Sequence, residues 1–424
     1  MDQPMKRPKP YAQPGPQAAS RDKARVSPRR ASTDALALDG GTPVRSAPLP
    51  GPYPGALRMG ADEEREVLEV LRSGGLFRYY GPAVLGKAAA FERGLARALG
   101  TTHALAVNSG TSALQCALFA LGVGPGDTVL VPAYSYVATA DVVLSLGAKP
   151  VFVEIDASMT MCPKDLAKKA TRDVKAISVV HLFGVPADMD PILRVAKKHH
   201  IPVVEDAAQS LGATYRGAHV GAIGDVGVTS FQLNKVITAG EGGAVMTSRD
   251  DLHERAVRHH DHGNHRDGAQ KAATMLGEGF RISELSAAVL VAQLKKLPKI
   301  VAELRKAKRY LGERLGDLPH AALTPVSDPE GDGGVALTLL CDEPGRAARA
   351  VAALERENIR ALRQYAGKLL YEQAPLVATG FEPNRCPRSE ELVARTVFLG
   401  MTTTLTRRDL DDVVRAYRKV FARV

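Results

Sequence analysis

A lysine and an aspartate, each placed beside a short apolar run, are the residues of this sequence best suited to covalent chemistry. Lys235 follows the run 226–231, and Asp206 ends the run 202–206. A lysine amine can form an imine with an aldehyde, and an aspartate can keep a pyridine nitrogen protonated so that the ring accepts electrons. The pair is therefore typical of an enzyme that uses pyridoxal 5'-phosphate (PLP).

Each of the two residues alone also fits an ordinary structural role. Lys235 could be a solvated surface lysine, and Asp206 could be a strand-end carboxylate that caps a loop. Both, however, stand at the carboxyl ends of apolar β-branched runs and are followed by small residues. Open α/β sheets bind their ligands at that edge, so the joint placement favours the functional interpretation.

A phosphate site is expected where the apolar run 104–107 turns into a helix. Gly110, Thr111 and Ser112 stand at this turn, where backbone N–H groups and the helix dipole would hold a phosphate dianion. Serine and threonine are also common N-caps of helices, so this motif is specific only in combination with the lysine and the aspartate.

Short apolar runs alternate with helical patterns through the first two thirds of the chain. The runs lie at residues 104–107, 128–131, 150–155, 176–182, 202–206, 226–231 and 244–247. Helical patterns lie between most of them, for example at residues 112–121 and 192–199. Continuous apolar strands that alternate with helices predict an α/β fold with a mostly parallel, seven-stranded sheet covered on both faces.

The remaining elements are expected on either side of this alternation. Helices are expected at residues 61–73 and around Phe91, Leu95 and Leu99, and a long amphipathic helix or helix pair is expected after Arg281. The C-terminal part reads as a smaller α+β domain. Its expected elements are a strand at 335–340, a helix at 346–357 and a last helix that Thr406 and Asp409 cap.

Length and composition divide the chain into parts. Its 424 residues exceed what one core usually holds. We expect a disordered basic tail (1–35), an N-terminal arm (36–60), a large PLP-binding α/β domain (61–300) and a small C-terminal domain (301–424). Residues 1–34 carry a net charge of +5 out of +10 for the chain and too little apolar surface to fold. We favour a solubilising or vestigial extension over the alternative, nucleic-acid binding by this tail.

Cysteine usage and hydropathy predict a cytoplasmic protein. The four cysteines form no C-x-x-C pair and no metal-like spacing, which indicates reduced thiols. The chain contains no apolar run long enough for a membrane span and no apolar core of a signal peptide.

Five motifs in this order resemble the DegT/StrS-type sugar aminotransferases, a PLP-dependent family with the aspartate aminotransferase-like fold type I. They are NSGTSAL at 108–114, PAYSYVATA at 132–140, EDAAQS at 205–210, SFQLNKVITAGEGGAV at 230–245 and GFRISELSAAVLVAQL at 279–294. The resemblance covers nearly everything from about residue 36 to the end of the chain.

The resemblance implies a role for each matching residue. Lys235 would bind PLP as an imine and move the proton, and Asp206 would pair with the pyridinium nitrogen. Gln209 would bind the phenolic oxygen of the cofactor, and Tyr136 would stack on its ring. The expected phosphate-binding residues are Gly110, Thr111, Ser112 and Ser230.

The resemblance also implies a homodimer with shared active sites, in which Arg281 is the residue expected to reach the other subunit's cofactor. The alternative for Arg281 is an exposed arginine at a helix start. Some family members have histidine in place of the lysine and carry out dehydration. Because Lys235 is present here, a full transamination is expected, with glutamine or glutamate as amino donor.

The keto acceptor is left open between two classes. The segments GGTPVR at 40–45 and RYYGP at 78–82 look more like the cyclitol-type members of the family, which favours a cyclitol or other free ketone over a nucleotide-linked ketosugar. Tyr79 and Tyr80 could narrow the pocket or simply pack on the arm. A PLP-binding regulator without catalytic activity is a further alternative, but such a protein would be expected to lose Lys235 or Asp206.

A histidine-rich stretch at residues 259–265 invites a metal-site interpretation. Its side chains crowd into what reads as one loop without helical spacing. We therefore expect a loop near the mouth of the active site and no metal.

Overall fold

The computed structural model describes residues 35–264, 273 and 275–424. The basic tail that the sequence predicts to be disordered lies outside these residues, apart from residue 35. No helix in the described ranges combines the length and the apolar character needed to cross a membrane.

A seven-stranded sheet forms the centre of the large domain. Its strand order is β1 (His103–Val107), β9 (Gly243–Thr247), β8 (Val226–Ser230), β5 (Val203–Asp206), β4 (Val174–Val180), β2 (Thr128–Pro132) and β3 (Lys149–Val153). Strand β9 runs antiparallel to its neighbours β1 and β8, and the other neighbours are parallel. The predicted α/β class and the mostly parallel sheet are confirmed.

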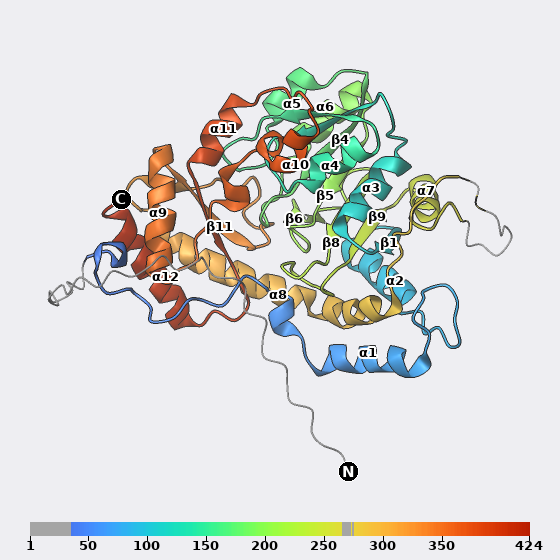
Figure 1. The fold of residues 1–424 in the computed structure, drawn as a ribbon, viewed down its shortest axis with the longest axis horizontal. Coiled ribbons are helices and arrows are strands. Elements are labelled where there is room, and N and C mark those ends of the chain that lie inside the picture. Colours follow the sequence, from blue (N-terminus) through green and yellow to red (C-terminus); the bar gives the residue numbers. More distant parts are fainter. Residues whose placement is uncertain (1–34, 265–272, 274) are drawn as a thin grey trace, which may run out of the picture.

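Helices cover both faces of this sheet. One face packs against α3 (Gly110–Ala120), α4 (Ala138–Ser145) and α7 (Asp250–His260), and the other packs against α5 (Pro163–Lys169) and α6 (Met189–His199). Figure 1 shows α5 and α6 side by side at one end of the large domain. Burial on both faces explains why the strands read as continuous apolar runs.

Three further helices form a layer below the sheet in Figure 1. They are α1 (Ala61–Ser73), α2 (Lys87–Leu99) and α8 (Glu284–Leu315). The sequence left open one helix or two after Arg281, and the structure has one helix of 32 residues with Pro298 inside it. Its apolar side contacts both domains, and the expected domain boundary at residue 300 falls within this helix.

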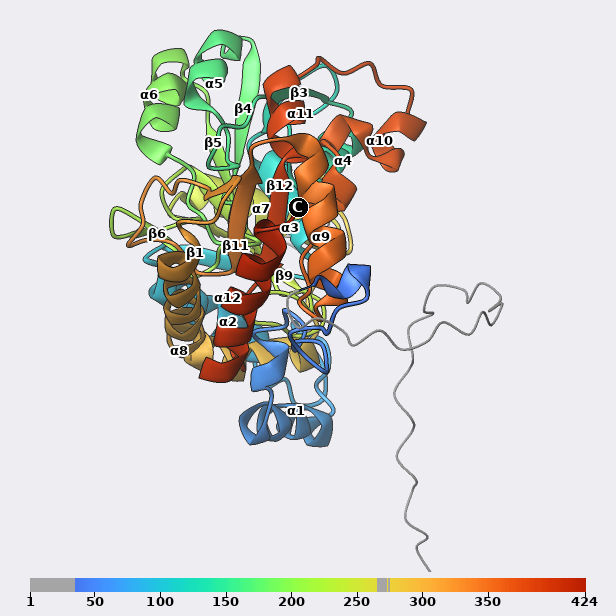
Figure 2. The same ribbon diagram turned by 90° about the vertical axis from the view of Figure 1, so that its left-hand side faces the viewer.

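The small domain contains a three-stranded antiparallel sheet in the order β10 (Ala321–Leu323), β11 (Ala336–Cys341) and β12 (Thr396–Gly400). Helix α9 (Pro344–Arg356) packs on this sheet, and α12 (Arg407–Phe421) packs on α8 and α9. Helices α9 and α12 lie side by side in both views (Figures 1 and 2). Thr406 and Asp409 form the predicted capping box at the start of α12. The sequence predicts β11, α9 and α12 but gives no signal for the short strands β10 and β12.

The segment between α9 and β12 returns to the large domain. It contains α10 (Ala374–Ala378) and α11 (Pro387–Ala394). Asn384 Oδ1 accepts a hydrogen bond of 2.9 Å from the backbone N–H of Phe152 on β3, and Ser389 Oγ accepts one of the same length from Ile155 N–H. The two domains are therefore joined by this segment as well as by α8.

The remaining elements are short. They are a two-stranded hairpin, β6 (Thr214–Tyr215) and β7 (Ala218–His219), and the 3-10 turns Ala37–Asp39, Ala56–Arg58, Gln364–Gly367 and Leu370–Glu372.

Candidate active site

Asp206 is the last residue of β5, in the middle of the large sheet. In the parallel register it stands beside Val180 on β4 and Val228 on β8, so three carboxyl ends meet around it. Its side chain is buried, with 6% of the residue exposed, and Oδ1 accepts a hydrogen bond of 2.9 Å from Ala208 N–H. This is the edge at which open α/β sheets bind ligands.

Lys235 lies in a tight turn that begins one strand away, directly after β8. Three hydrogen bonds close the base of this turn: Phe231 N–H donates to Gly242 O (2.8 Å), Ala239 N–H to Phe231 O (3.0 Å) and Thr238 Oγ1 to Phe231 O (2.8 Å). Lys235 N–H donates to Gln232 O at 2.9 Å. The lysine is therefore held by a fixed backbone rather than by a mobile surface loop.

The structure brings Lys235 and Asp206 close enough to perturb each other. Burial raises the pKa of the Asp206 carboxyl, and the attraction of Lys235 only partly opposes this shift. Burial likewise lowers the pKa of the Lys235 ammonium, against the opposing attraction of Asp206. An amine with a lowered pKa is more often neutral and nucleophilic, as imine formation requires.

The turn between β1 and α3 packs directly against the ends of β8 and β9. A Cβ atom on Gly110 would lie 2.7 Å from Ser230 Cβ, and one on Gly243 would lie 2.2 Å from Ser109 O. Only glycine permits this close approach at both positions. The start of α3 is thereby fixed beside Ser230, whose Oγ accepts a hydrogen bond of 3.3 Å from Gln232 N–H.

The N-cap of α3 is Ser109. Gly110, Thr111 and Ser112, the residues expected at this turn, follow it. Ser109 Oγ accepts a hydrogen bond of 3.0 Å from Ser112 N–H. The Ser112 hydroxyl is buried and donates to Asn108 Oδ1 at 2.6 Å, so it also fixes the turn itself. The Thr111 side chain is exposed. Helix starts of this kind bind anions through their free N–H groups.

Tyr136 and Gln209 approach the same region from different strand ends. Tyr136 lies between β2 and α4 and is 57% exposed. Gln209 Nε2 donates a hydrogen bond of 2.8 Å to the hydroxyl of Tyr365 in the small domain. The ring centres of Tyr136 and Tyr365 are 6.3 Å apart. Tyr365 gives no signal in the sequence, because it follows no recognisable strand end.

Arg281 lies beside the phosphate-type turn of its own chain. Its backbone forms a bridge with Val107, and Asn108 N–H donates to Phe280 O at 2.8 Å. The guanidinium forms an ion pair of 2.6 Å with the buried Asp261 and lies 5.5 Å from the centre of the Phe77 ring. The side chain is thus engaged at this position, and the reach to a second subunit stays a prediction.

The sequence analysis missed a buried histidine–glutamate pair next to Asp206. His181 Nε2 lies 2.9 Å from Glu205 Oε2, and both residues are fully buried. Because Ala187 N–H donates to His181 Nδ1 at 3.0 Å, Nε2 carries the proton and donates to Glu205. The sequence does contain a signal for this pair, because Glu205 is a charged residue inside the apolar run that forms β5.

The expectation of a loop for the histidine-rich stretch is wrong in part. His259 and His260 form the last turn of α7. The His259 ring stacks on Phe119 at 3.9 Å between ring centres, and His260 Nε2 lies 2.8 Å from the Tyr79 hydroxyl. The histidine at position 265 lies outside the described residues. Among those described, no group of three or more metal-ligating side chains gathers.

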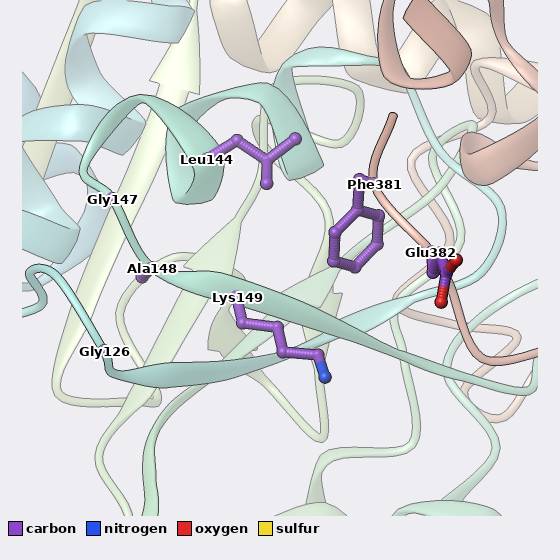
Figure 3. A pocket seen from close by; sticks show the side chains of 7 residues that line it. All are labelled: Gly126, Leu144, Gly147, Ala148, Lys149, Phe381 and Glu382. Carbon is purple, nitrogen blue, oxygen red and sulfur yellow. The ribbon is translucent and has the colours of Figure 1, made fainter. Parts of the chain in front are cut away.

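Two hollows elsewhere contain none of the predicted site residues. One is a cavity of about 370 Å³ at the start of β3. Figure 3 shows Lys149, Phe381 and Glu382 among the side chains that line it. A groove of about 1110 Å³ follows the exposed side of α8. The first lies at the amino ends of β2 and β3, which is the sheet edge opposite to Asp206.

The residues present fit PLP. Such a cofactor needs an amine for its aldehyde, an acid for its ring nitrogen and N–H donors for its phosphate. These groups are present at one end of the parallel strands, on Lys235, on Asp206 and at the start of α3. The start of α3 lies in close contact with Ser230, because Gly110 has no side chain.

The fold and this site together define an aminotransferase-type α/β enzyme. A profile of the DegT/DnrJ/EryC1/StrS aminotransferase family matches residues 58–418. Because the match covers most of the chain, the protein belongs to this family.

Relatives with named activities include several aminotransferases. GDP-perosamine synthase of Caulobacter vibrioides is 40% identical over 244 residues, which are 55% of this chain and 65% of that protein. The L-glutamine:2-deoxy-scyllo-inosose aminotransferase of Micromonospora echinospora is 35% identical, and its match covers 91% of this chain and 98% of that protein. The enzyme of the same name from Streptomyces lividus is 39% identical over 70% of this chain and 71% of its own length.

Solved structures confirm the fold. 3-Amino-5-hydroxybenzoic acid synthase superposes with a TM-score of 0.82 at 27% identity over 89% of this chain and all of that chain. DesV of S. venezuelae, solved in complex with a ketimine intermediate, superposes with a TM-score of 0.80 at 31% identity over the same shares.

Proposed function

We propose that this aminotransferase uses PLP to convert a ketone of a cyclitol or ketosugar to an amine, with glutamine or glutamate as donor. The observation that carries the proposal is the Lys235–Asp206 pair beside the ends of two adjacent strands. Burial raises the pKa of Asp206 and lowers the pKa of Lys235, and the attraction between the two charges opposes both shifts. When bound, PLP supplies an electron sink for the carbanion that forms at the substrate carbon.

Asp206 has the role of holding a proton on the ring nitrogen. Its raised pKa follows from burial, and its one backbone donor is Ala208 N–H. A carboxylate short of hydrogen bonds in a buried position pairs strongly with a cationic N–H. Asp206 is therefore suited to cap the loop with one oxygen and to pair with the pyridinium nitrogen through the acceptor capacity that remains.

Lys235 has two roles in the proposal. Its amine would hold the aldehyde carbon of the cofactor, and it would also move a proton between cofactor carbon and substrate carbon. Burial lowers its ammonium pKa, which favours the neutral amine that removes a proton. The closed turn from Phe231 to Gly242 fixes the backbone of the lysine, and the amine lies near enough to Asp206 for the two charges to interact.

The remaining site residues bind and orient. Gly110, Thr111 and Ser112 at the start of α3, together with Ser230, would hold the phosphate through backbone N–H groups and hydroxyls. Tyr136 would cover one face of the cofactor ring, and the Tyr136 side chain is exposed, so a cofactor can reach it. Gln209 would donate an amide N–H to the phenolic oxygen.

A homodimer with shared sites forms part of the proposal. Apolar side chains are exposed on α1 and on the turn that follows it, namely Leu68, Leu71, Leu76, Tyr80 and Leu85. An apolar patch of this kind is more typical of a protein interface than of a free surface. In such a dimer Arg281 would reach the cofactor of the other subunit.

We favour a cyclitol or other free ketone as acceptor, and a nucleotide-linked ketosugar is the second candidate. Relatives named for 2-deoxy-scyllo-inosose support the first, and the relative named GDP-perosamine synthase supports the second. Tyr79 is held by His260, whereas Tyr80 is 67% exposed and packs on Phe77 with ring centres 4.7 Å apart. This aromatic turn would narrow the space left for a large nucleotide.

The test is a matrix of donors and acceptors with mass detection. Purified protein loaded with PLP is incubated with glutamine or glutamate, and with either scyllo-inosose-type cyclitols or nucleotide-linked ketosugars. The proposal expects an amine product from the cyclitol with at least one donor, and none from the Lys235→Ala variant. Product from nucleotide ketosugars alone would overturn the favoured acceptor, and no product from any pair would contradict the transamination itself.

A cytoplasmic location is also proposed. All four cysteines, Cys116, Cys162, Cys341 and Cys386, are buried and free of disulfides. Unpaired cysteines are typical of a reducing compartment.

A further inference from the structure

Tyr365 brings the small domain into the proposed active site. It lies in the segment between α9 and α10, and its hydroxyl accepts the 2.8 Å hydrogen bond from Gln209 Nε2. Burial raises the pKa of the Tyr365 hydroxyl, and the charge of Asp206 adds to this shift. The proposed transamination gives Tyr365 no role.

The backbone that delivers Tyr365 is strained. Tyr365 has φ 52° and ψ 33°, Ala366 has φ 56° and ψ 22°, and Gly367 has φ 67°. Two consecutive residues with side chains in the left-handed region are unfavourable, because each Cβ crowds the following carbonyl. Such strain persists only where surrounding contacts hold it, and it gathers at functional sites.

Several contacts hold Tyr365 in this conformation. The Tyr134 hydroxyl donates to Gln364 O at 3.0 Å, and the Tyr134 ring lies 5.4 Å from the Tyr365 ring in an edge arrangement. Phe183 stacks on the Tyr365 ring with ring centres 6.1 Å apart. Tyr134 follows β2 and Phe183 follows β4, so the large domain fixes the ring that reaches it.

The consequence concerns the Gln209 amide. A glutamine amide nitrogen has two N–H donors, and a side chain held at one of them presents the other in a defined direction. We infer that Tyr365 is a positioning residue: its hydroxyl holds one N–H of Gln209 so that the second N–H faces the phenolic oxygen of the cofactor. This inference rests on the proposed function, because it assumes PLP beside Asp206.

The first test measures PLP binding to Tyr365→Phe, which keeps the ring and removes the hydroxyl. We expect the dissociation constant for PLP to rise about five- to ten-fold, the equivalent of one hydrogen bond. The pH at which the visible band of bound PLP titrates should also rise, because a well-placed donor stabilises the ionised phenolic oxygen. Unchanged affinity and an unchanged titration would overturn the inference.

The second test asks whether Tyr365 acts through Gln209. In a Gln209→Ala background, Tyr365→Phe should change the PLP dissociation constant less than about twofold, because the amide that Tyr365 holds is gone. If the hydroxyl instead contacts the cofactor directly, the full effect will persist in that background, and the positioning role is wrong.

Two variants serve as controls for folding and strain. Tyr371→Phe removes a buried small-domain hydroxyl that bonds Glu390 and Cys386 but does not contact Gln209, so PLP affinity should stay unchanged. Ala366→Gly keeps the Tyr365 hydroxyl and relieves the left-handed strain, so thermal stability should rise and affinity should not fall. If Tyr365→Phe fails to fold, Tyr134→Phe takes its place, because it removes the hydroxyl that holds the turn at Gln364 O. PLP should then bind more weakly, and unchanged affinity would contradict the inference.

The outcome separates this inference from the proposed function. Failure of the wild-type protein to bind PLP contradicts the function and leaves nothing for Tyr365 to position. Normal PLP binding by wild type and by Tyr365→Phe alike contradicts only the role of Tyr365.

Discussion

Glu205 and Asp206 are neighbours on β5, yet the structure surrounds their carboxylates in opposite ways. Glu205 is fully buried. It accepts hydrogen bonds from the imidazole of His181 and from the backbone N–H groups of Gly221, Ile223 and Gly224. Asp206 accepts one from Ala208 N–H and lies near Lys235. Burial raises the pKa of both carboxyls, but the donors around Glu205 outweigh it and hold that pKa below its ordinary value.

The difference teaches how a structural carboxylate is told from a functional one. A buried carboxylate with all its acceptor sites filled holds the fold together, because its partners already stabilise the charge. A buried carboxylate with few partners, next to a cation and a sheet edge, has bonding capacity left for a ligand. Each prediction below removes one of the groups on which this contrast depends.

The largest expected effect follows from Lys235→Ala. Turnover should fall by about 10³-fold or more, because both imine formation and proton transfer lose their amine. The fold should persist, which circular dichroism will check. Lys149→Ala is the matched control: Lys149 is the first residue of β3, whereas Asp206 is the last residue of β5, so its removal should leave turnover unchanged. A Lys235→Ala variant that keeps a tenth of wild-type turnover would refute the assignment.

Asp206→Asn should have the next largest effect on rate. Without the carboxylate the ring nitrogen loses its proton, and kcat should fall on the order of 10²-fold. Stability at pH 7 should stay equal or rise slightly, because the raised pKa of Asp206 means that folding disfavours its ionised form. Steady-state kinetics and urea unfolding measure the two quantities, and wild-type kinetics would show that another group protonates the ring.

Glu205→Gln should reverse that pattern. The free energy of unfolding at pH 7 should fall by about 1–3 kcal/mol, because the amide cannot accept every donor that the carboxylate satisfies. The folded-state pKa of Glu205 is lowered, so its contribution is present above the ordinary value near 4.5 and is lost as pH falls through the folded value. Urea unfolding should therefore show wild type and variant converging in acid; a constant gap would argue against an ionised Glu205.

The smallest expected effect comes from deletion of residues 1–34. The deletion removes a net charge of +5 but no residue of the five motifs. PLP content, oligomeric state and kinetics should be nearly unchanged. Any affinity for nucleic acid should be weak, dependent on salt and lost with the tail. Specific DNA or RNA binding by the shortened protein at physiological salt would contradict a purely metabolic role.

The sequence predicts most of the large domain because buried parallel strands leave a simple pattern. The apolar runs that precede Lys235 and Asp206 become β8 and β5, with ends that differ by a residue or so from those expected. In the small domain the signal is weaker. β10 has three residues, too few to show a pattern of alternation, and β12 follows α11 with a single residue between them, so no turn separates it from the helix.

The active site divides in the same way. Motif residues on strand ends could be placed from the sequence, because the sheet determines where those ends meet. Tyr365 could not, since its position depends on a left-handed turn and on rings from β2 and β4 that only the tertiary fold brings together. The sequence analysis placed His259 and His260 in a loop because this stretch is polar. They belong to α7, which is stabilised by packing against α3.

The most direct test of the account is to locate the cofactor covalently. Protein loaded with PLP is reduced with borohydride, digested, and its peptides are sequenced by mass spectrometry. The account predicts one pyridoxyl group per chain on Lys235, with loss of the visible absorbance, and none in Lys235→Ala. A label on another lysine in the unmutated protein, or no label despite bound PLP, would contradict the central role of Lys235.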